Sequence, residues 1–518
     1  MSSVPRLFAS DIVGIDAYIV EVEADLNVGL HSFQIVGLAD KAVSEAKERV
    51  SSALKHLGAR PPTKENKKIT VNLAPADVKK SGSRFDLSIA LAYLLATEQI
   101  APFSPDDKMF LGELSLDGAV RPVPGVLSSA ILAKEKGIQT LFVPKENAEE
   151  AALLTDISIV PVENLLQLVA HLEGREKIVP QPATRVSFSF PPSITRLSEV
   201  KGQKNAKRAL LVAAAGGHHL FFSGPPGTGK TMLAQALISL LPPPSLQEII
   251  EITRVYSSSG LPAQAGLASE QAFFSHRPFR SPHHSASFIA LLGGGPDPRP
   301  GEMSFAHRGV LFLDEAPEFR RDVLEALRQP LESGEVHVSR ARRSLRFPAR
   351  FQLVLAMNPC PCGYYGDKEH DCRCTAHEVF RYQKKLSGPL MDRIDIQIDV
   401  PRIPIHELRE EKYDTNEEEK FREEVGRARE RQRERFQKAH FSCFTNSDMS
   451  SRQVDSVVKI SADGETLLRN VLQKSFVSAR GYYRIIKLAQ TIADLEGADV
   501  VTDKHLSEAF QYRIKNSE

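Results

Sequence analysis

The segment at residues 224–231 has the composition and spacing that point most directly to chemistry. It reads Gly-Pro-Pro-Gly-Thr-Gly-Lys-Thr and lies between an apolar run at 220–222 and a stretch of helical spacing. Glycines let successive backbone N–H groups curl around phosphate oxygens, and a helix that starts there adds its dipole. The segment therefore predicts an ATP site, in which Lys230 reaches the outer phosphates and Thr231 holds Mg²⁺. The alternative is a Gly/Pro-rich turn that binds nothing. The ATP-binding residues are predicted to be Gly224, Pro225, Pro226, Gly227, Thr228, Gly229, Lys230, Thr231 and, from the next motif, Asp314.

Polar side chains follow two further strand-like runs. Residues 311–313 are apolar and are followed by Asp314 and Glu315, and residues 351–356 lead to Asn358. We expect Asp314 to hold Mg²⁺ and Glu315 to polarise the attacking water, while the amide of Asn358 contacts the γ-phosphate or that water. The alternative for the two acids is a cap on the segment that follows them.

The order of these motifs, followed by Arg393, Arg480 and Arg484, resembles the AAA+ ATPases. The resemblance implies that Asn358 is sensor 1 and that Arg393 is an arginine finger reaching the ATP of a neighbouring subunit. It also implies that Arg480 is sensor 2, with Arg484 as the other candidate for that role. A finger supplied in trans implies a ring. The alternative for each arginine is a surface ion pair.

Other stretches carry a closer resemblance. They are Arg-Ser-Pro-His-His at 280–284, Gly-Gly-Gly at 293–295, and the stretches 298–302, 306–315, 358–363 and 491–497. Along nearly its whole length the chain resembles magnesium-chelatase-like AAA+ proteins of the YifB/ComM type. This implies a hexameric, ATP-driven DNA motor that drives branch migration in homologous recombination and natural transformation. Its implied partners are single-stranded and branched DNA and recombination proteins. A rival is a chelatase-like remodeller that acts with a partner subunit.

A basic hairpin is predicted at residues 335–347. Val336 and Val338 alternate with polar residues, as do Leu345 and Phe347, around a basic tip. Phosphate contacts supply affinity without sequence preference, which suits a motor. A solvated basic turn is the alternative. The predicted DNA contacts are Arg340, Arg342, Arg343 and Arg346. The preceding segment, 276–308, is rich in histidine and arginine and is expected to form an extended loop, which the resemblance places near the ring's pore.

Four of the five cysteines form two C-x-C pairs separated by nine residues. Four thiolates can close a tetrahedral Zn²⁺ site, with His370 and His377 as substitute ligands. The alternative is four reduced surface thiols. A zinc ion here would stiffen the loop beside the nucleotide, a structural role and not a catalytic one. The predicted zinc ligands are Cys360, Cys362, Cys372 and Cys374. Cys443 stands apart and is assigned to packing.

The N-terminal region resembles a Lon-protease-type domain through residues 72–87 and 112–120. The family's nucleophilic serine would fall at Arg84, or at Ser83 if the alignment shifts by one position. Its lysine would fall at Leu127. Without a Ser–Lys pair no nucleophile is activated, so an ATP-dependent protease is disfavoured. We interpret the domain as a platform for binding or ring assembly.

The bulk composition is that of an ordinary globular chain. Its 518 residues are 42% hydrophobic and 25% charged, and the net charge is +1. DNA binding must therefore come from local patches. No secretory signal or membrane-length apolar run is evident, and cysteines are sparse, so a cytoplasmic location is expected.

The predicted fold class is α/β. An AAA+ P-loop core, a parallel sheet covered by helices, follows an N-terminal Lon-like α+β domain and precedes a helical C-terminal lid. Within the first domain, strands are expected at 20–24 and 69–73 and helices at 42–57 and 87–96. A charged helix within 407–438 is expected to be solvated and to connect subdomains. The predicted domains are 1–175, a Pro-rich linker at 176–193, the ATPase core at 194–402 and the lid at 403–518.

Overall fold

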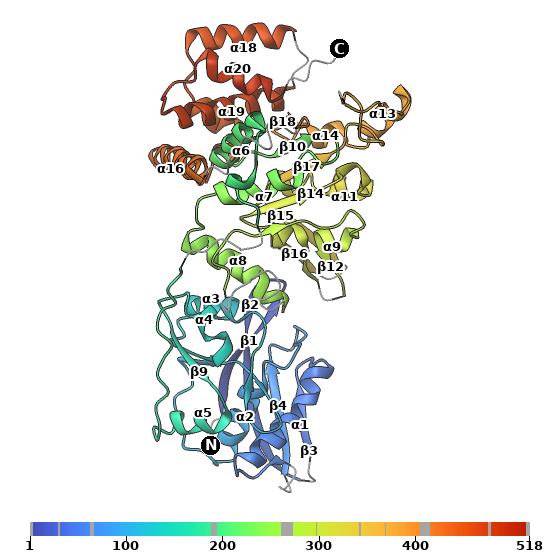
Figure 1. Ribbon diagram of the computed structural model, residues 1–518. Coiled ribbons are helices and arrows are strands. Elements are labelled where there is room, and N and C mark those ends of the chain that lie inside the picture. The colour runs from blue at the N-terminus through green and yellow to red at the C-terminus, as the bar shows by residue number, and fades with distance from the viewer. Residues whose placement is uncertain are drawn as a thin grey trace. The chain divides into compact units, whose positions relative to one another are not determined.

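The computed structural model (Figure 1) describes residues 4–29, 32–62, 67–187, 194–260, 273–296, 298–340, 343–367, 369–404, 415–474 and 478–513. Its contacts divide the chain into two compact units. Unit 1 comprises Met1–Ser187 and Ser245–Ser275, and unit 2 comprises Phe188–Pro244 and His276–Glu518. The domain boundaries drawn from sequence stay predictions. None of them anticipated that residues 245–260 and 273–275 pack with the N-terminal part of the chain.

Unit 1 is built on a seven-stranded mixed sheet of order β3-β4-β2-β1-β5-β8-β9. β1 pairs antiparallel with β2, and β2 with β4, while the remaining neighbours in the sheet are parallel. The strands are β1 (Arg6–Val13), β2 (Asp16–Val28), β3 (Ser32–Val36), β4 (Lys67–Ala74), β5 (Lys108–Phe110), β8 (Thr140–Pro144) and β9 (Ser158–Val162). A separate two-stranded pair joins β6 (Glu113–Leu114) and β7 (Val120–Arg121). The predicted strands at 20–24 and 69–73 are confirmed within β2 and β4.

Helices α2 and α3 pack against β1 and β2 of this sheet. α1 begins after Asp40, whose carboxylate accepts the N–H of Val43 and so satisfies a free donor of the first turn. The predicted helices at 42–57 and 87–96 are confirmed as α1 and α2. The helices are α1 (Lys41–His56), α2 (Asp86–Ala96), α3 (Val126–Glu135), α4 (Ala148–Ala151), α5 (Leu165–Leu172) and α8 (Leu246–Ser259).

α8 is attached to unit 1 by polar and apolar contacts with α3 and its neighbours. The Arg254 guanidinium pairs with Asp16 at 2.5 Å and donates to the Ser128 hydroxyl at 3.2 Å. The Ser257 carbonyl accepts the N–H of Gly125 at 2.9 Å. An apolar cluster completes the interface, formed by Leu127, Leu153, Ile249 and Phe273. Leu127, where the resemblance would require a catalytic lysine, is therefore a packing residue.

Arg84, the residue at the expected nucleophile position, is buried in a polar network. Its guanidinium lies 3.8 Å from the Asp11 carboxylate and donates to the carbonyls of Ser10 and Pro124. Ser83, the other candidate, donates its hydroxyl to Glu113. Both side chains therefore have structural partners, and the expectation that this domain is not proteolytic stays a prediction.

Unit 2 contains a five-stranded sheet of order β11-β14-β17-β10-β18 in which every pairing is parallel. The strands are β11 (Phe279–Arg280), β14 (Val310–Leu313), β10 (Leu220–Ser223), β17 (Gln352–Met357) and β18 (Ile396–Asp399). β10, β14 and β17 are fully buried, as expected for a sheet covered on both faces. The predicted parallel, helix-covered sheet is thereby confirmed.

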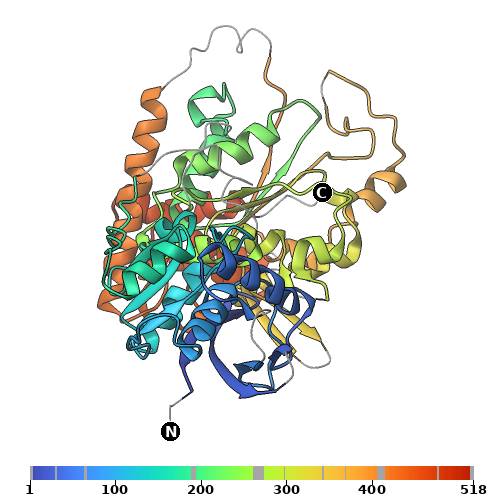
Figure 2. The ribbon, with the colours of Figure 1, turned by 90° about the horizontal axis from the view of Figure 1, so that it is seen from below.

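Helices surround this sheet and continue into a helical C-terminal region (Figure 2). α16, the long orange helix in that view, packs against α6 and α19 and buries Val425, Ala428 and Phe436. The prediction that this helix is solvated is therefore wrong for one face of α16. Apolar residues on that face are buried, although charged residues surround them in the sequence. The longer helices are α6 (Lys204–Gly216), α7 (Lys230–Leu240), α13 (Ala376–Gln383), α16 (Thr415–Lys438), α17 (Ser451–Val457), α18 (Ala462–Lys474), α19 (Ala479–Glu496) and α20 (Asp503–Gln511). No helix in the described ranges of either unit is long and apolar enough to cross a membrane.

The segment 276–308 differs from the predicted extended loop. It contains α9 (Phe288–Leu292), α10 (Glu302–Phe305) and a small pair formed by β12 (Gly293–Gly294) and β13 (Arg299–Pro300). Leu291 and Met303 are fully buried in the core of unit 2. The segment is predicted to be a loop because it is rich in histidine, arginine and glycine. Its two buried apolar side chains pack into the core and hold the segment in place.

Glu150 provides a test of the attachment of α8. This carboxyl group is buried, hydrogen-bonds to Ser257 of α8, and accepts a bond from Asn147 at 3.0 Å. Burial raises its pKa to about 7. Since the folded state holds the proton more tightly than the unfolded state, its contribution to stability is full at low pH. That contribution is lost as pH rises from about 4.5 to about 7, by up to about 3 kcal/mol.

We therefore expect Glu150→Gln to flatten this pH dependence. Urea unfolding of the full chain at pH 5 and pH 8 should show a smaller loss of stability in the variant than in the wild type. Glu149→Gln, at the exposed neighbouring position, should behave as wild type. An unchanged pH dependence in Glu150→Gln would contradict the assignment.

Candidate nucleotide site and its surroundings

The predicted ATP-binding residues lie where three neighbouring strands of unit 2 end. The P-loop follows β10, Asp314 follows β14 and Asn358 follows β17. These strands are parallel and adjacent in the order β14-β17-β10, so their carboxyl ends meet at one edge of the sheet. Residues separated by more than a hundred positions are thereby brought together.

The P-loop has the backbone conformation that its glycines permit. Gly227 and Gly229 have φ of 78° and 85°, and Gly229 directly precedes α7. Gly224 lies against β18, since a Cβ added there would be 2.2 Å from the Val400 carbonyl oxygen. Side chains at these positions would strain the turn or collide with the sheet, which explains the glycine spacing.

Lys230 is held at the centre of the loop. Its ammonium donates to the carbonyls of Gly224 at 2.7 Å and Pro225 at 2.9 Å, and to Oδ1 of Asn358 at 3.1 Å. Burial lowers the pKa of Lys230, whereas the charges of Asp314 and Glu315 oppose that shift. The contact to Asn358 unites the predicted phosphate-binding lysine with the predicted sensor 1.

A second pair offers oxygen ligands for a cation. The Thr231 hydroxyl donates to Oδ2 of Asp314 at 2.9 Å, and Oδ1 of Asp314 accepts the N–H of Glu315 at 2.9 Å. A hydroxyl and a carboxylate at the start of a phosphate-binding helix are the donor set that Mg²⁺ takes beside nucleotide phosphates. The residues present therefore fit a magnesium–nucleotide site.

Glu315 is exposed and adopts a φ of 49°, in the left-handed region. Such a backbone is uncommon for glutamate, and the position begins a short 3₁₀ turn, Ala316–Glu318. Oε2 of Glu315 lies 3.6 Å from Nδ1 of His284. No spacing pattern in the sequence points to this neighbour, because His284 lies in the segment 276–308, for which an extended loop is predicted.

The predicted finger Arg393 and the predicted sensor 2 Arg480 share one partner. Arg393 is buried, donates to the Pro389 carbonyl at 2.6 Å, and pairs with the Glu332 carboxylate. Arg480 pairs with the same oxygen of Glu332 at 2.7 Å, and half of its side chain is exposed. Among the described residues, neither arginine forms an ion pair with the P-loop or with the acids beside it.

Arg484 is placed differently from Arg480. It donates to the Arg393 carbonyl at 2.7 Å and pairs with Asp395 at 2.5 Å. Asp395 is buried beside Nδ1 of His218, 3.4 Å away, and accepts the N–H of His219. Burial alone would raise the pKa of Asp395, but Arg484 and the two histidines hold it well below its ordinary value. Arg484 therefore links α19 to the backbone of Arg393, the predicted finger.

The predicted basic hairpin is confirmed as β15 (Glu335–Arg340) paired antiparallel with β16 (Arg343–Pro348). Arg340 and Arg343 stand opposite each other at its end, and Arg346 is exposed opposite His337. Arg342 and the side chains of Arg340 and Arg343 lie outside the described residues. A cavity of 800 Å³ lies beside the hairpin, lined by residues of α9 and β15 and by Glu332 and Arg393.

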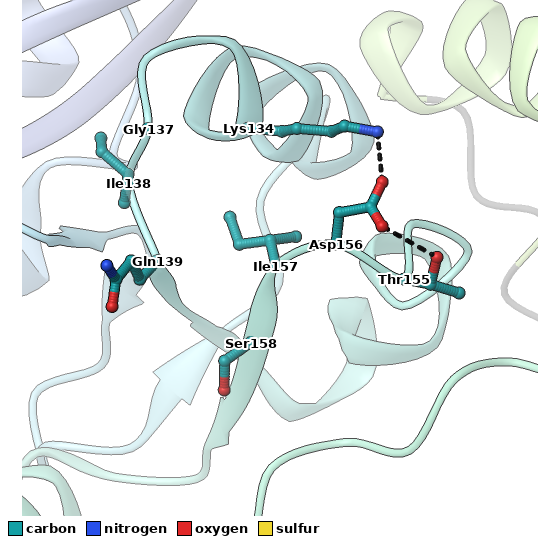
Figure 3. A pocket seen from close by; sticks show the side chains of 8 residues that line it. All are labelled: Lys134, Gly137, Ile138, Gln139, Thr155, Asp156, Ile157 and Ser158. Atoms are coloured by element: carbon teal, nitrogen blue, oxygen red, sulfur yellow. Dashed lines mark hydrogen bonds and ion pairs between the residues drawn. The ribbon is translucent and has the colours of Figure 1, made fainter.

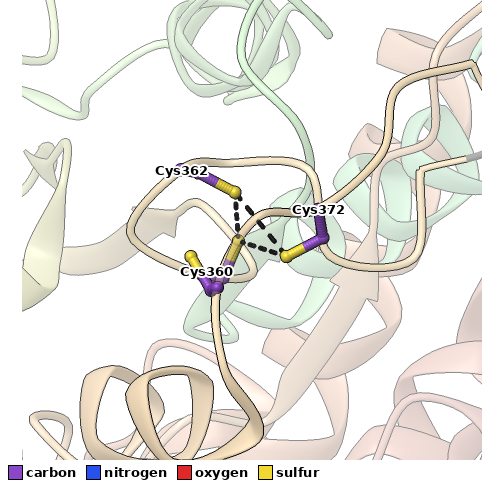
Figure 4. A group of neighbouring side chains, drawn as sticks. Cys360, Cys362 and Cys372 are labelled. Carbon is purple, nitrogen blue, oxygen red and sulfur yellow. Dashed lines mark hydrogen bonds between the residues drawn. The ribbon is translucent and has the colours of Figure 1, made fainter.

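The four clustered cysteines converge in the loop that follows Asn358 (Figure 4). Their sulfur atoms all lie within 4.8 Å of one another, and no other group of three or more metal-ligating residues is found in the described ranges. The predicted substitute ligands His370 and His377 are not part of this group. Cys443 lies apart and packs against the core of unit 2.

A cavity in unit 1 offers less chemistry (Figure 3). It has a volume of 530 Å³ and lies between the end of α3 and the start of β9. Its charged pair, Lys134 and Asp156, is joined in an exposed ion pair, and Thr155 donates to Asp156 at 3.5 Å. Each charge of this pair is neutralised by the other, so we assign no function to this cavity.

Comparisons with known proteins agree with this geometry. Three family models match the chain. The model "Magnesium chelatase, subunit ChlI" matches residues 196–408, and the model "Subunit ChlI of Mg-chelatase" matches residues 22–147. The model "Magnesium chelatase, subunit ChlI C-terminal" matches residues 415–513. "Competence protein ComM" of Haemophilus influenzae is 43% identical over 99% of this chain and 97% of its own. "Uncharacterized protein YifB" of Escherichia coli is 41% identical over 97% and 95%.

A Lon protease of Rhizobium meliloti is 29% identical over 159 residues, which are 30% of this chain and 19% of the protease. This similarity covers only part of each protein, and it agrees with the Lon-like character of the N-terminal region. The three ChlI matches together span both units. The chain therefore belongs to the magnesium-chelatase-like AAA+ proteins of the YifB/ComM type, with an AAA+ core, a Lon-protease-like N-terminal region and a helical C-terminal region.

Proposed function

We propose that this chain is an ATP-hydrolysing motor that works on DNA as a hexameric ring and acts as a branch-migration helicase. The observation that carries the ATPase is the meeting of Lys230 with Asn358 and of Thr231 with Asp314 at one sheet edge. The name of the Haemophilus relative, "Competence protein ComM", supports a role in competence, and we propose that this role is homologous recombination during natural transformation. Recombination proteins are the partners, and the cytoplasm the location, that fit such a role.

Each residue of the site has a step in this proposal. The backbone N–H groups of the P-loop and Lys230 bind the β- and γ-phosphates of ATP. Thr231 and Asp314 hold Mg²⁺, which neutralises charge on the phosphates when bound. Glu315 accepts a proton from the attacking water, and Asn358 orients that water or the γ-phosphate. His284 is placed to restrain the Glu315 carboxylate between turnovers.

Arg393 and Arg480 are proposed to act together on the ATP of a neighbouring subunit. Both are held by Glu332, so buried Arg393 and half-exposed Arg480 lie side by side in unit 2. An arginine that leaves a carboxylate for a transferring phosphoryl group stabilises its developing charge. Two such arginines on one subunit favour a ring in which each ATP is completed by its neighbour.

DNA contact is assigned to the hairpin formed by β15 and β16. Arginines at its end suit phosphate binding, which is independent of sequence and weakens with salt. Exposed Arg346 lies on the same element. A motor that grips single-stranded and branched DNA of any sequence needs no base contacts.

A second candidate is a chelatase-like remodeller that uses ATP to rearrange a partner subunit. The matches to magnesium chelatase subunit ChlI favour it. The two candidates share the nucleotide site and differ at the hairpin, so the response of ATPase activity to DNA separates them.

The roles of Lys230 and Glu315 predict two different losses. Lys230→Ala should abolish ATP binding, because the phosphates lose their buried cation. Glu315→Gln should bind ATP and assemble but turn over about 10²–10⁴-fold more slowly, as expected for loss of a general base. Nucleotide binding, native mass and steady-state turnover check both variants. Normal turnover in Glu315→Gln would refute its assignment as the base.

The contacts of Arg484 and Arg480 predict a separation between stability and catalysis. Arg484→Ala should lower the free energy of unfolding by about 3 kcal/mol, because it leaves buried Asp395 without its cation. Arg480→Ala should change stability by less than about 1 kcal/mol, since its ion pair is half exposed, yet it should slow ATP turnover. Urea unfolding and ATPase assays on both variants check this. The opposite pattern would make Arg484 the sensor.

The DNA assignment predicts that ATP turnover rises with single-stranded DNA or a four-way junction. An Arg343→Ala/Arg346→Ala variant should lose that rise and keep its DNA-independent turnover. Exposed Arg427 on α16 provides a matched control, because Arg427→Ala removes a positive charge away from the hairpin. ATP turnover that is unchanged by every DNA tested would favour the chelatase-like remodeller.

A further inference from the structure

We propose that the four-cysteine loop holds one Zn²⁺ ion and that this ion fixes the loop as a wall of the P-loop, so that nucleotide binding depends on zinc. The proposal rests on the proposed ATP site for its second half only. The loop comprises residues 358–375 between β17 and α13, with residue 368 outside the described ranges.

The spacing of the sulfur atoms matches a tetrahedral metal site. Sγ of Cys360 lies 3.3 Å from that of Cys362 and 3.7 Å from that of Cys372, and the last two are 3.6 Å apart. Four sulfurs at about 2.3 Å from a central zinc would be about 3.8 Å from one another. A disulfide requires about 2.05 Å, so these distances describe separate thiol groups arranged around a common centre.

Backbone donors surround the sulfurs. N–H groups of Tyr364 and Arg373 donate to the sulfur of Cys362, and the N–H of Cys362 donates to the sulfur of Cys374. Such N–H···S bonds orient ligands and stabilise negative charge on thiolate sulfur. The donor set consists of thiols alone, which favours zinc or iron over magnesium.

The loop has almost no apolar core of its own. Between Pro361 and Thr375 its described residues form turns without helix or strand, and most are exposed or only partly buried. Cys360, at the start of the loop, is fully buried. A segment without an apolar core needs a cross-link to keep one conformation, and a metal bound to four side chains supplies it.

This loop lies directly against the nucleotide site. Cys360 is two residues from Asn358, whose amide oxygen accepts the bond from Lys230. Gly363 has a φ of 88°, and a Cβ added there would be 2.7 Å from Cδ of Pro226 in the P-loop. Farther along, Asp367 pairs with Arg402 at 2.8 Å and ties the loop to the chain beyond β18. Loss of the ion would release both the sensor side and the P-loop side of the site.

The first experiment measures metal in the purified full chain by mass spectrometry. We expect about one zinc per chain in the wild type and in Cys443→Ser, which removes the unclustered thiol. Cys372→Ser/Cys374→Ser should lose the zinc. Lys230→Ala should keep it, so the metal site is tested even if the chain binds no ATP. Iron in place of zinc, or no metal in wild type dialysed against zinc, would overturn the metal assignment.

The second experiment tests the contact with the P-loop while all cysteines are kept. Gly363→Ala places a methyl group against Pro226, whereas Gly366→Ala meets nothing within 4 Å at a similar φ of 78°. Both variants should retain zinc. We expect the affinity for a fluorescent ATP analogue to fall at least about tenfold in Gly363→Ala and to be little changed in Gly366→Ala.

Chelation provides a reversible test of the same coupling. Stripping zinc from the wild type should weaken ATP binding to a similar degree, and added zinc, but not added magnesium alone, should restore it. Equal affinity in Gly363→Ala and Gly366→Ala, or unchanged affinity after zinc is removed, would refute the coupling. A wild type that holds zinc but never binds ATP would instead refute the proposed function.

Discussion

The parallel hydrogen-bond ladder between β10 and its two neighbours is the constraint on which the rest of unit 2 depends. Ser223 pairs in register with Met357 on one side and with Asp399 on the other. The N–H of Gly224 continues the ladder to the Met357 carbonyl at 3.2 Å. The hydrogen bonds therefore fix where the P-loop begins relative to the end of β17, the strand that Asn358 follows. A shift of register by one residue would reverse the faces of these strands and separate Lys230 from its partner.

A second fixed point joins the C-terminal helices to this sheet. Asp395, just before β18, gathers Arg484 from α19 and the His218–His219 pair that leads into β10. Arg484 also holds the carbonyl of Arg393. One buried carboxylate thus joins β18, α19 and the segment that carries Arg393, the proposed arginine finger. A movement of α19 would therefore reach the backbone of Arg393.

The sequence identified residues whose chemistry is local and missed partners that depend on tertiary contacts. The P-loop and the acids after β14 follow from residue type, spacing and an apolar strand, and the structure brings them together. Glu332 could not be found in this way, because nothing near it in the chain shows that two arginines meet there. His284 was missed for the same reason, since its contact with Glu315 depends on the tertiary fold of the segment before α9.

The separation of Arg480 from Arg484 shows the same limit from the other side. Both lie in the first turns of α19, four residues apart, so periodicity gives them nearly the same face. Their partners distinguish them, since Arg484 pairs with buried Asp395 and Arg480 pairs with Glu332. The attachment of α8 to unit 1 is another tertiary effect. Its sequence between 246 and 259 reads as an ordinary amphipathic helix, and its partner surface is supplied by residues more than a hundred positions earlier.

The position of α8 has a mechanical consequence for the nucleotide site. α7, which begins at Lys230, ends at Leu240, and α8 begins at Leu246. Three successive prolines, residues 242–244, occupy most of the connection, and a proline run is semi-rigid. The helix that starts at the phosphate site is therefore joined by a short, stiff link to a helix that belongs to the other unit. Any displacement of α7 that accompanies ATP binding must be absorbed in that link or passed to α8. The polar contacts of Arg254, Ser257 and Glu150 hold α8 within unit 1, so this link is the covalent path by which a displacement of α7 would reach that unit.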